Sequence, residues 1–156
     1  MIAIIELWIE GLLFQYKDNR VSCATLPAAV TQFFPEAFLQ QSYFVETTDI
    51  PKPTIAVGIT GAEDFLAMPA QGITYNDTYF LLPNSTKSTH LHELVHVAQW
   101  KELGMRGFIT SYIAGVQKYG YYDSPLEQMA YGMQHEFESG CATFDVVSRV
   151  KQALSQ

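Results

Sequence analysis

The chain has 156 residues, of which 48% are hydrophobic and 13% aromatic, and its formal net charge at pH 7 is −7. This composition excludes an intrinsically disordered chain, and the acidic balance argues against nucleic acid as a partner. No repeat or linker divides the sequence, so we expect one domain over residues 1–156 that is large enough to bury a core. The only cysteines, Cys23 and Cys141, are expected to be buried free thiols.

The N-terminal stretch 1–14 is almost entirely apolar, although Glu6 and Glu10 interrupt it. It is too short to span a bilayer, and it lacks the basic start and the small-residue cleavage site of a signal peptide. We therefore expect a helix that packs its Ile, Leu and Trp side chains on the core of a cytoplasmic protein with no transmembrane segment. The alternatives are a helix on a membrane surface and a segment, residues 1–20, that covers a cleft.

Short elements bounded by proline, glycine and asparagine follow up to residue 82. Alternating and β-branched stretches predict strands, and Asn76-Asp77 between two of them predicts a tight hairpin. In chain order we expect one or two helices at 26–41, a strand at 42–47, a proline-rich connection at 49–53, a strand at 54–60, a loop or helical turn at 63–65, and hairpin strands at 72–75 and 78–82.

The rest of the chain has helical periodicity. We expect helices at about 89–103, 106–119, 124–137 and 139–154. The loop at 83–88 ends in a hydroxyl N-cap for the first of them, and Gly104 ends that helix. Because strands come first and helices afterwards, the predicted class is α+β, with a small, mostly antiparallel sheet followed by helices.

Residues 92–96 read His-Glu-Leu-Val-His and lie in the first of these helices. Histidines four residues apart on a helix project from the same face one turn apart, where a single Zn²⁺ ion can accept both imidazoles. Glu93 is then free to take a proton from a zinc-bound water. His90 points about 160° away from His92 round the helix and is predicted not to bind the metal. The alternative is a pair of surface histidines on an ordinary helix.

A catalytic zinc site needs a third protein ligand. No histidine follows His96 closely, which excludes the metzincin pattern, so the ligand must come from further downstream. Glu127 is the best candidate, because Ser124 and Pro125 open a helix beside it. The same spacing makes a capping box, in which Glu127 would only bond back to the backbone of Ser124. The other candidates are Asp123, His135, Glu136, Glu138 and Cys141.

Residues 92–100 and 124–131 together resemble a bacterial family of small zincin-like metallopeptidases of the gluzincin type. The resemblance covers roughly residues 26–138 and is loose upstream of the motif. It implies a compact zincin-like fold around an active-site helix, a catalytic Glu93, and the zinc ligands His92, His96 and Glu127. It implies no particular substrate.

The large gluzincins carry an aspartate one turn after the glutamate ligand, and here Tyr131 stands in that place. We expect Tyr131 to take part in catalysis, either by orienting a zinc histidine or by facing the substrate. His135 follows one turn later and is expected to be a surface histidine. In this fold the strand at 78–82 has a free edge to which an extended peptide can add.

The sequence thus predicts a zinc-dependent metallopeptidase that hydrolyses peptide bonds in a peptide or protein substrate. The reaction would use a zinc-bound water, with Glu93 as general base. Two alternatives remain open. One is a zincin-like module that binds zinc without turnover and acts in binding or regulation, and the other is a latent peptidase held by its N-terminal segment.

Overall fold

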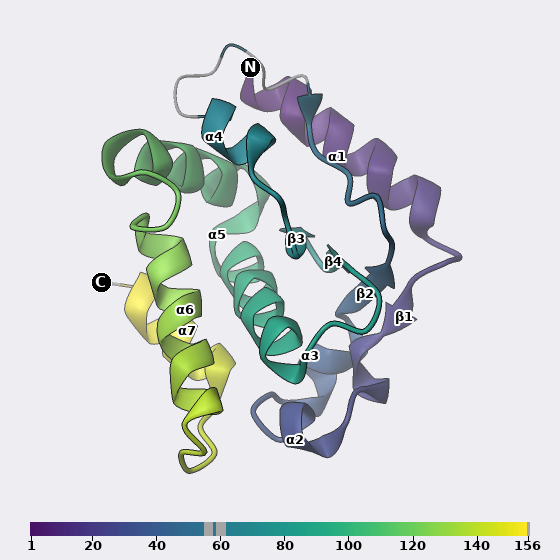
Figure 1. Ribbon diagram of the computed structural model, residues 1–156, viewed down its shortest axis with the longest axis vertical. Helices are drawn as coiled ribbons and strands as arrows, with labels where there is room; N and C mark the ends of the chain where they lie inside the picture. Colours follow the sequence, from purple (N-terminus) through teal and green to yellow (C-terminus); the bar gives the residue numbers. More distant parts are fainter. Residues whose placement is uncertain (55–57, 59–61, 156) are drawn as a thin grey trace.

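The computed structural model describes residues 1–54, 58 and 62–155, and within them the fold is α+β, as predicted. Seven α-helices and a four-stranded sheet make up the described chain (Figure 1). The helices are α1 (Ile2–Tyr16), α2 (Ala28–Thr31), α3 (Glu36–Gln40), α4 (Ala62–Ala67), α5 (Lys87–Tyr119), α6 (Pro125–Glu138) and α7 (Val146–Leu154). The strands are β1 (Val21–Ser22), β2 (Tyr43–Glu46), β3 (Gly72–Tyr75) and β4 (Thr78–Leu81), and a short 3-10 helix, η1, spans Cys23–Thr25.

The sheet has the strand order β1-β2-β4-β3 and is mixed. β1 pairs antiparallel with β2, β2 runs parallel to β4, and β3 pairs antiparallel with β4 through the predicted hairpin, where Asn76 has a φ of 58°. The expectation of a free edge on the strand at 78–82 is wrong, because β2 occupies the side of β4 that the hairpin leaves open. Among the described strands, β3 is the one at the edge of the sheet next to β4.

The motif helix and its successor form one element, α5, with a sharp break at Gly104. Gly104 has φ 74° and ψ 166°, which only glycine adopts readily, so the predicted pair of helices on either side of it is confirmed. The helix begins two residues earlier than expected. Its N-cap is Thr86, whose hydroxyl accepts a hydrogen bond from the backbone N–H of Thr89.

Most other predicted elements are confirmed, with shifted ends. α6 opens with Ser124 as N-cap and Pro125 at its first position. The last helix is shorter than the predicted 139–154, because Gly140 has a φ of 75° and the new helix starts only after Asp145, which caps it. Most of the strand predicted at 54–60 lies outside the described residues.

The first half of α5 lies between the sheet and the pair α6 and α7 (Figure 1). Side chains alternate across the strands, so Phe44 and Tyr79 pack in a core with α5, whereas Val45 and Phe80 pack in a second core that includes α1. The predicted packing of the N-terminal helix is confirmed by its buried residues, Ile5, Ile9 and Leu12. No helix in the described part of the chain is long and apolar enough to cross a membrane.

Candidate metal centre

The three predicted ligands come from two helices that pack closely together. His92 and His96 lie on successive turns of α5, and Glu127 lies in the first turn of α6. The helices can approach because Ala130 faces the contact, and because Gly115 lies so close to Pro125 that a Cβ atom would come within 3.1 Å of its ring. The three residues are only 6%, 5% and 3% exposed, so each polar group needs a partner inside the protein.

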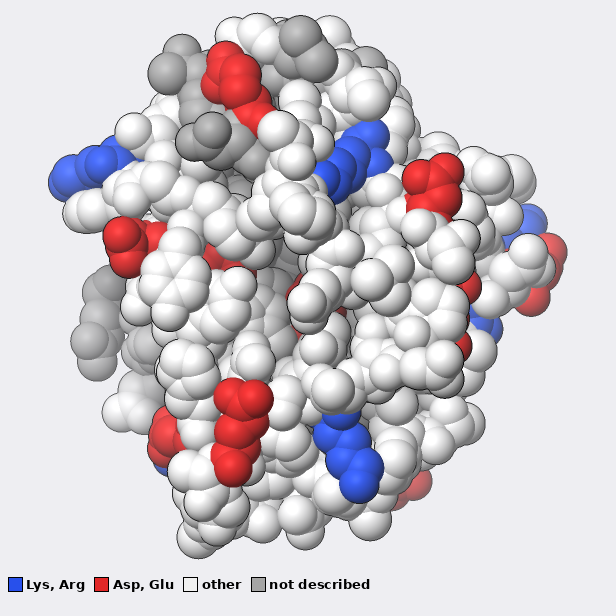
Figure 2. Space-filling model, in the orientation of Figure 1, with Lys and Arg blue, Asp and Glu red and all other residues white. Residues whose placement is uncertain are grey.

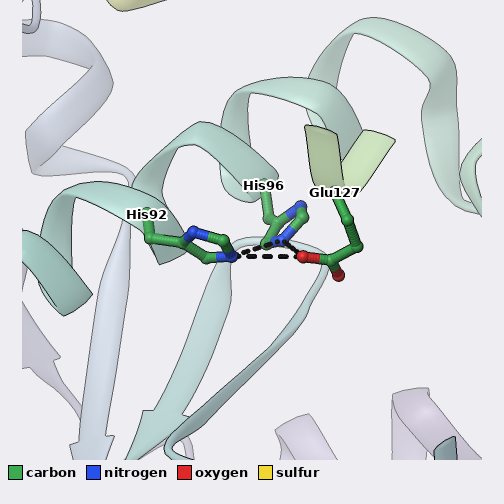
Figure 3. Close-up of side chains that lie close together, drawn as sticks. All are labelled: His92, His96 and Glu127. Atoms are coloured by element: carbon green, nitrogen blue, oxygen red, sulfur yellow. Dashed lines mark hydrogen bonds and ion pairs between the residues drawn. The ribbon is translucent and has the colours of Figure 1, made fainter. Parts of the chain in front are cut away.

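Figure 3 shows that the donor atoms of these residues converge on one point. Nε2 of His92 and Nε2 of His96 each lie 3.2 Å from Oε1 of Glu127, and they are 3.2 Å from each other. Bonds of about 2.05 Å at tetrahedral angles would separate zinc ligand atoms by about 3.3 Å. The spacing and the chemistry of the donors therefore fit a tetrahedral zinc ion with one position left open. Within the described chain, no other His, Cys, Asp or Glu side chains form such a group.

Two glutamines determine which ring nitrogens face the centre. Nδ1 of His92 donates a hydrogen bond to Oε1 of Gln134 at 2.9 Å, and Nδ1 of His96 donates to Oε1 of Gln99 at 2.8 Å. The amide of Gln99 is itself held, because its NH₂ group donates to the carbonyl of Leu126 at 3.0 Å. With the proton on Nδ1, each neutral ring turns a lone pair on Nε2 toward the other and toward a carboxylate oxygen. While both rings are neutral, that arrangement is repulsive, and either a metal ion or a proton between the three atoms removes the repulsion.

The charge state of the carboxylate and of His96 reflects this arrangement. Burial alone would raise the pKa of Glu127, but the two histidines outweigh it and hold that pKa well below its usual range. Burial would likewise lower the pKa of His96, yet Glu127 raises it to about 9. Tyr112 donates a hydrogen bond to Oε2 of Glu127 at 2.7 Å, so both carboxylate oxygens are engaged. Glu127 occupies position N3 of α6, but its carboxylate does not form a capping box, and Ser124 makes no side-chain cap bond.

Glu93 lies beside this group without belonging to it. Its Oε2 is 4.0 Å from Nε2 of His92, and its Oε1 accepts a hydrogen bond from the hydroxyl of Thr74 on β3 at 2.9 Å. Burial raises the pKa of Glu93 above its ordinary value. Gly72 leaves room for this carboxylate, because a Cβ atom there would lie 3.0 Å from Cδ and Oε2 of Glu93. A carboxylate with a raised pKa beside an open metal position is suited to accept a proton.

The half-buried Tyr131 lies against the first histidine, with its ring centroid 4.5 Å from that of His92. Tyr121, in the turn between α5 and α6, and Tyr131 both line a polar cavity over His92 and Glu93. The positive φ of Gly120 starts that turn. Burial raises the pKa of both tyrosines, so their hydroxyls keep their protons and are available as donors.

The remaining candidates lie away from the centre. His135 is exposed, as predicted, and His90 shares a 2.7 Å hydrogen bond with the hydroxyl of Tyr79. Asp123, Glu136 and Glu138 are exposed and Cys141 is half-buried. Cys23 and Cys141 are free thiols as expected, although only Cys23 is fully buried.

A polar cavity of about 270 Å³ opens over His92 and Glu93. Figure 2 shows a hollow on this face with acidic side chains partly visible at its bottom, while lysines and arginines are scattered rather than gathered in a patch. The segment 68–71 forms one wall of the cavity. Lys52 holds that wall by donating to the carbonyl oxygens of Phe65, Leu66 and Met68, which closes the end of α4.

Comparisons of the chain with family models, with curated proteins and with solved structures found no match. The zincin-like family therefore stays a prediction from the two motifs. The functional argument rests on the geometry of the site itself.

Proposed function

We propose that the protein is a zinc-dependent peptidase with His92, His96 and Glu127 as its metal ligands and Glu93 as its general base. The observation that carries the proposal is the convergence of three buried donor atoms, about 3.2 Å apart. One of them belongs to His92, which lines a polar cavity together with the carboxylate of Glu93. A structural ion would be enclosed by four protein ligands. Here three ligands and a neighbouring base leave a position for water and substrate.

When bound, zinc supplies a Lewis acid that polarises a carbonyl and lowers the pKa of water. Glu93 accepts the proton of the attacking water and delivers it to the leaving amine. Thr74 fixes the rotamer of Glu93 by donating to Oε1, which leaves Oε2 toward His92 for proton transfer. Tyr121 and Tyr131 line the same cavity, and their protonated hydroxyls are the nearest candidates to stabilise the oxyanion.

The edge strand β3 gives this site a way to hold an extended peptide. β3 is the terminal strand of the described sheet, and its Gly72 lines the polar cavity beside Glu93. A peptide that pairs with the outer edge of β3 would run past Glu93 and present a backbone carbonyl to the metal. The sequence predicted that the strand at 78–82 would bind the peptide, but that strand is interior, so we assign peptide binding to β3, its hairpin partner.

Metal analysis and one conservative variant test the proposal. We expect about one zinc per chain in the wild-type protein and none in His92→Ala. Glu93→Gln should keep the zinc and lose hydrolysis of a mixed peptide library by about 100-fold or more, because only the base is removed. Glu102→Gln, at an exposed position of α5, the helix that also carries Glu93, is the matched control and should retain activity. Full activity in Glu93→Gln would contradict the proposed mechanism, and zinc without any wild-type hydrolysis would favour a binding module.

A further inference from the structure

A second cavity, of about 120 Å³, also meets the candidate centre and shares Met68, Gly72, Glu93 and Tyr121 with the polar one. Glu93, His96 and Glu127 are part of its wall, so it opens onto the atoms that would perform the reaction. The rest of its lining is mostly apolar and comes mainly from α1, β3, α4 and both halves of α5. Those side chains include Ile5, Ile9, Trp100, Phe108 and Ile113.

The size and lining of this cavity define what can enter it. Protein interiors leave few voids larger than a water molecule, so an apolar space of this volume beside buried polar groups is a feature of the site and not a packing defect. A cavity of about 150 Å³ lined by similar side chains is known to accept benzene. A leucine, methionine or phenylalanine side chain is therefore of suitable size. No lysine or arginine lines the cavity in the described chain, and its carboxylates would repel an acidic group.

We propose that this cavity binds a large apolar side chain of the substrate residue next to the scissile bond. The inference rests on the proposed peptidase function and adds the substrate class. It also gives α1 a role: Ile5 and Ile9 form part of the apolar wall, whereas no residue of α1 lines the polar cavity. The N-terminal helix is thus a component of the binding site, although it does not line the polar cavity.

Binding can be measured apart from turnover with zinc-loaded Glu93→Gln protein and peptide hydroxamates, whose hydroxamate group ligates zinc. Two series are needed, with the varied side chain on one side or the other of that group, and with Ala, Asp, Leu or Phe at the varied position. In one series the Leu and Phe compounds should bind at least about tenfold tighter than the Ala compound, and the Asp compound should bind weakest. Calorimetry gives the affinities. A Trp8→Phe background leaves Trp100, which lines the cavity, as the only tryptophan to report occupancy by fluorescence.

Two substitutions at neighbouring positions distinguish the effect of filling the cavity from the effect of adding a phenyl ring to the surface. Ile113 lines the cavity and is half-buried, so Ile113→Phe should fill it and remove the preference for Leu and Phe while binding of the Ala compound persists. Ala114 is exposed and lies outside the cavity, so Ala114→Phe adds the same ring one residue later and should keep the preference.

The outcomes distinguish the two proposals. Equal affinities across the side chains, a preference unchanged by Ile113→Phe, or no hydroxamate binding by zinc-loaded protein would each overturn the pocket assignment. Cleavage of peptides without an apolar preference would overturn it as well and leave the peptidase proposal standing. A clear preference for Leu and Phe in a protein that cleaves no peptide would uphold the pocket and contradict the peptidase.

Discussion

Gln134 contacts His92 from α6, and Gln99 contacts His96 from the next turn of α5. Both are neutral acceptors, where many metal histidines instead donate to a carboxylate. A neutral amide fixes the ring orientation without adding negative charge to a buried site that already contains Glu93 and Glu127. The two carboxylates would otherwise face further repulsion in a region of low dielectric constant. A metal ion bound there would have a less electron-rich environment, which would favour its action as a Lewis acid.

Gln134→Ala should therefore weaken zinc binding by about 10–100-fold, because the His92 ring loses the acceptor that orients it. Gln134 is only half-buried, so the metal-free protein should keep most of its stability. Competition with a chromogenic chelator measures the affinity. Gln128→Ala removes the same side chain from an exposed position of the same helix and should bind zinc as the wild type does. Equal affinities in the two variants would remove the positioning role from Gln134.

A side chain at position 72 should displace the carboxylate of Glu93 and leave zinc binding unchanged. In Gly72→Ala the new methyl group would lie 3.0 Å from Cδ and Oε2 of Glu93, so the carboxylate must move. Displacement of a base by a fraction of an ångström should lower kcat by about 10–100-fold if the proposed hydrolysis is correct, with zinc content unchanged. Steady-state kinetics and metal analysis on the same samples measure this. Gly132→Ala, on α6, has open space around its Cβ and should behave as the wild type. Wild-type kcat in Gly72→Ala would show that Glu93 tolerates the shift.

The motif His92-Glu93-Leu94-Val95-His96 could be predicted to lie on one helix because its spacing is the signal. The residues that hydrogen-bond to the proposed ligands could not be predicted in the same way, since a single glutamine or tyrosine in a helix forms no recognisable pattern. Gln99 had one local clue, because it lies three residues after His96 and so shares its face. Gln134 and Tyr112 had none that does not require knowing how α5 packs on α6.

At the scale of elements, Gly104 redirects α5 so that its second half returns toward the centre. Trp100 and Phe108 stack across the break with ring centroids 4.1 Å apart, and Tyr112, one turn further, reaches Glu127. A straight helix would carry residues 105–119 away from the site. The break at Gly104 thus allows the second half of α5 to place Tyr112 against Glu127 and to form the far wall of the apolar cavity.

Gly104→Ala should destabilise the protein by about 1–3 kcal/mol, because its φ of 74° and ψ of 166° are strained for a residue with a Cβ atom. No neighbouring atom lies within 4 Å of the added Cβ, so the backbone conformation is the only cause. Gly107→Ala is the matched control, with helical backbone and an ordinary 3.5 Å contact to Leu103. It should stabilise the protein by about 0.5–1 kcal/mol. Urea denaturation measures both changes, and equal effects would contradict the argument.

Short sequence patterns predicted the positions of the helices and strands well, but they did not predict which strands pair with one another. Gly104, Pro125 and Asn76 each marked a boundary that the structure has, because their effects on the backbone are local. The start of α5 was misplaced because several hydroxyl residues precede it and Thr86 rather than Ser88 makes the cap bond. The expectation that the strand at 78–82 has a free edge is wrong because β2 pairs with β4. This pairing joins segments far apart in the chain, and no local sequence pattern encodes it.

At the scale of the whole molecule, the centre joins two parts of the fold. His92 and His96 belong to α5, which packs on the sheet, whereas Glu127 belongs to α6 on the other side of α5 (Figure 1). Without a cation, two lone pairs and a carboxylate oxygen are held about 3.2 Å apart, and His96 relieves the repulsion by binding a proton, as its raised pKa of about 9 indicates. A metal ion bound at the centre would replace that proton and link the two helices directly.

Zinc should therefore stabilise the folded protein by mass action, because the unfolded chain has no preformed site. At free zinc of about 100 times the dissociation constant the gain is about 2.7 kcal/mol. For a chain of this size that corresponds to a rise in Tm of about 5–11 °C. Calorimetry with and without a chelator measures the shift. His92→Ala should unfold at one temperature under both conditions, because two ligands no longer define the site. A zinc-dependent rise of the same size in His92→Ala would mean that the ion binds elsewhere, and the link between α5 and α6 would lose its support.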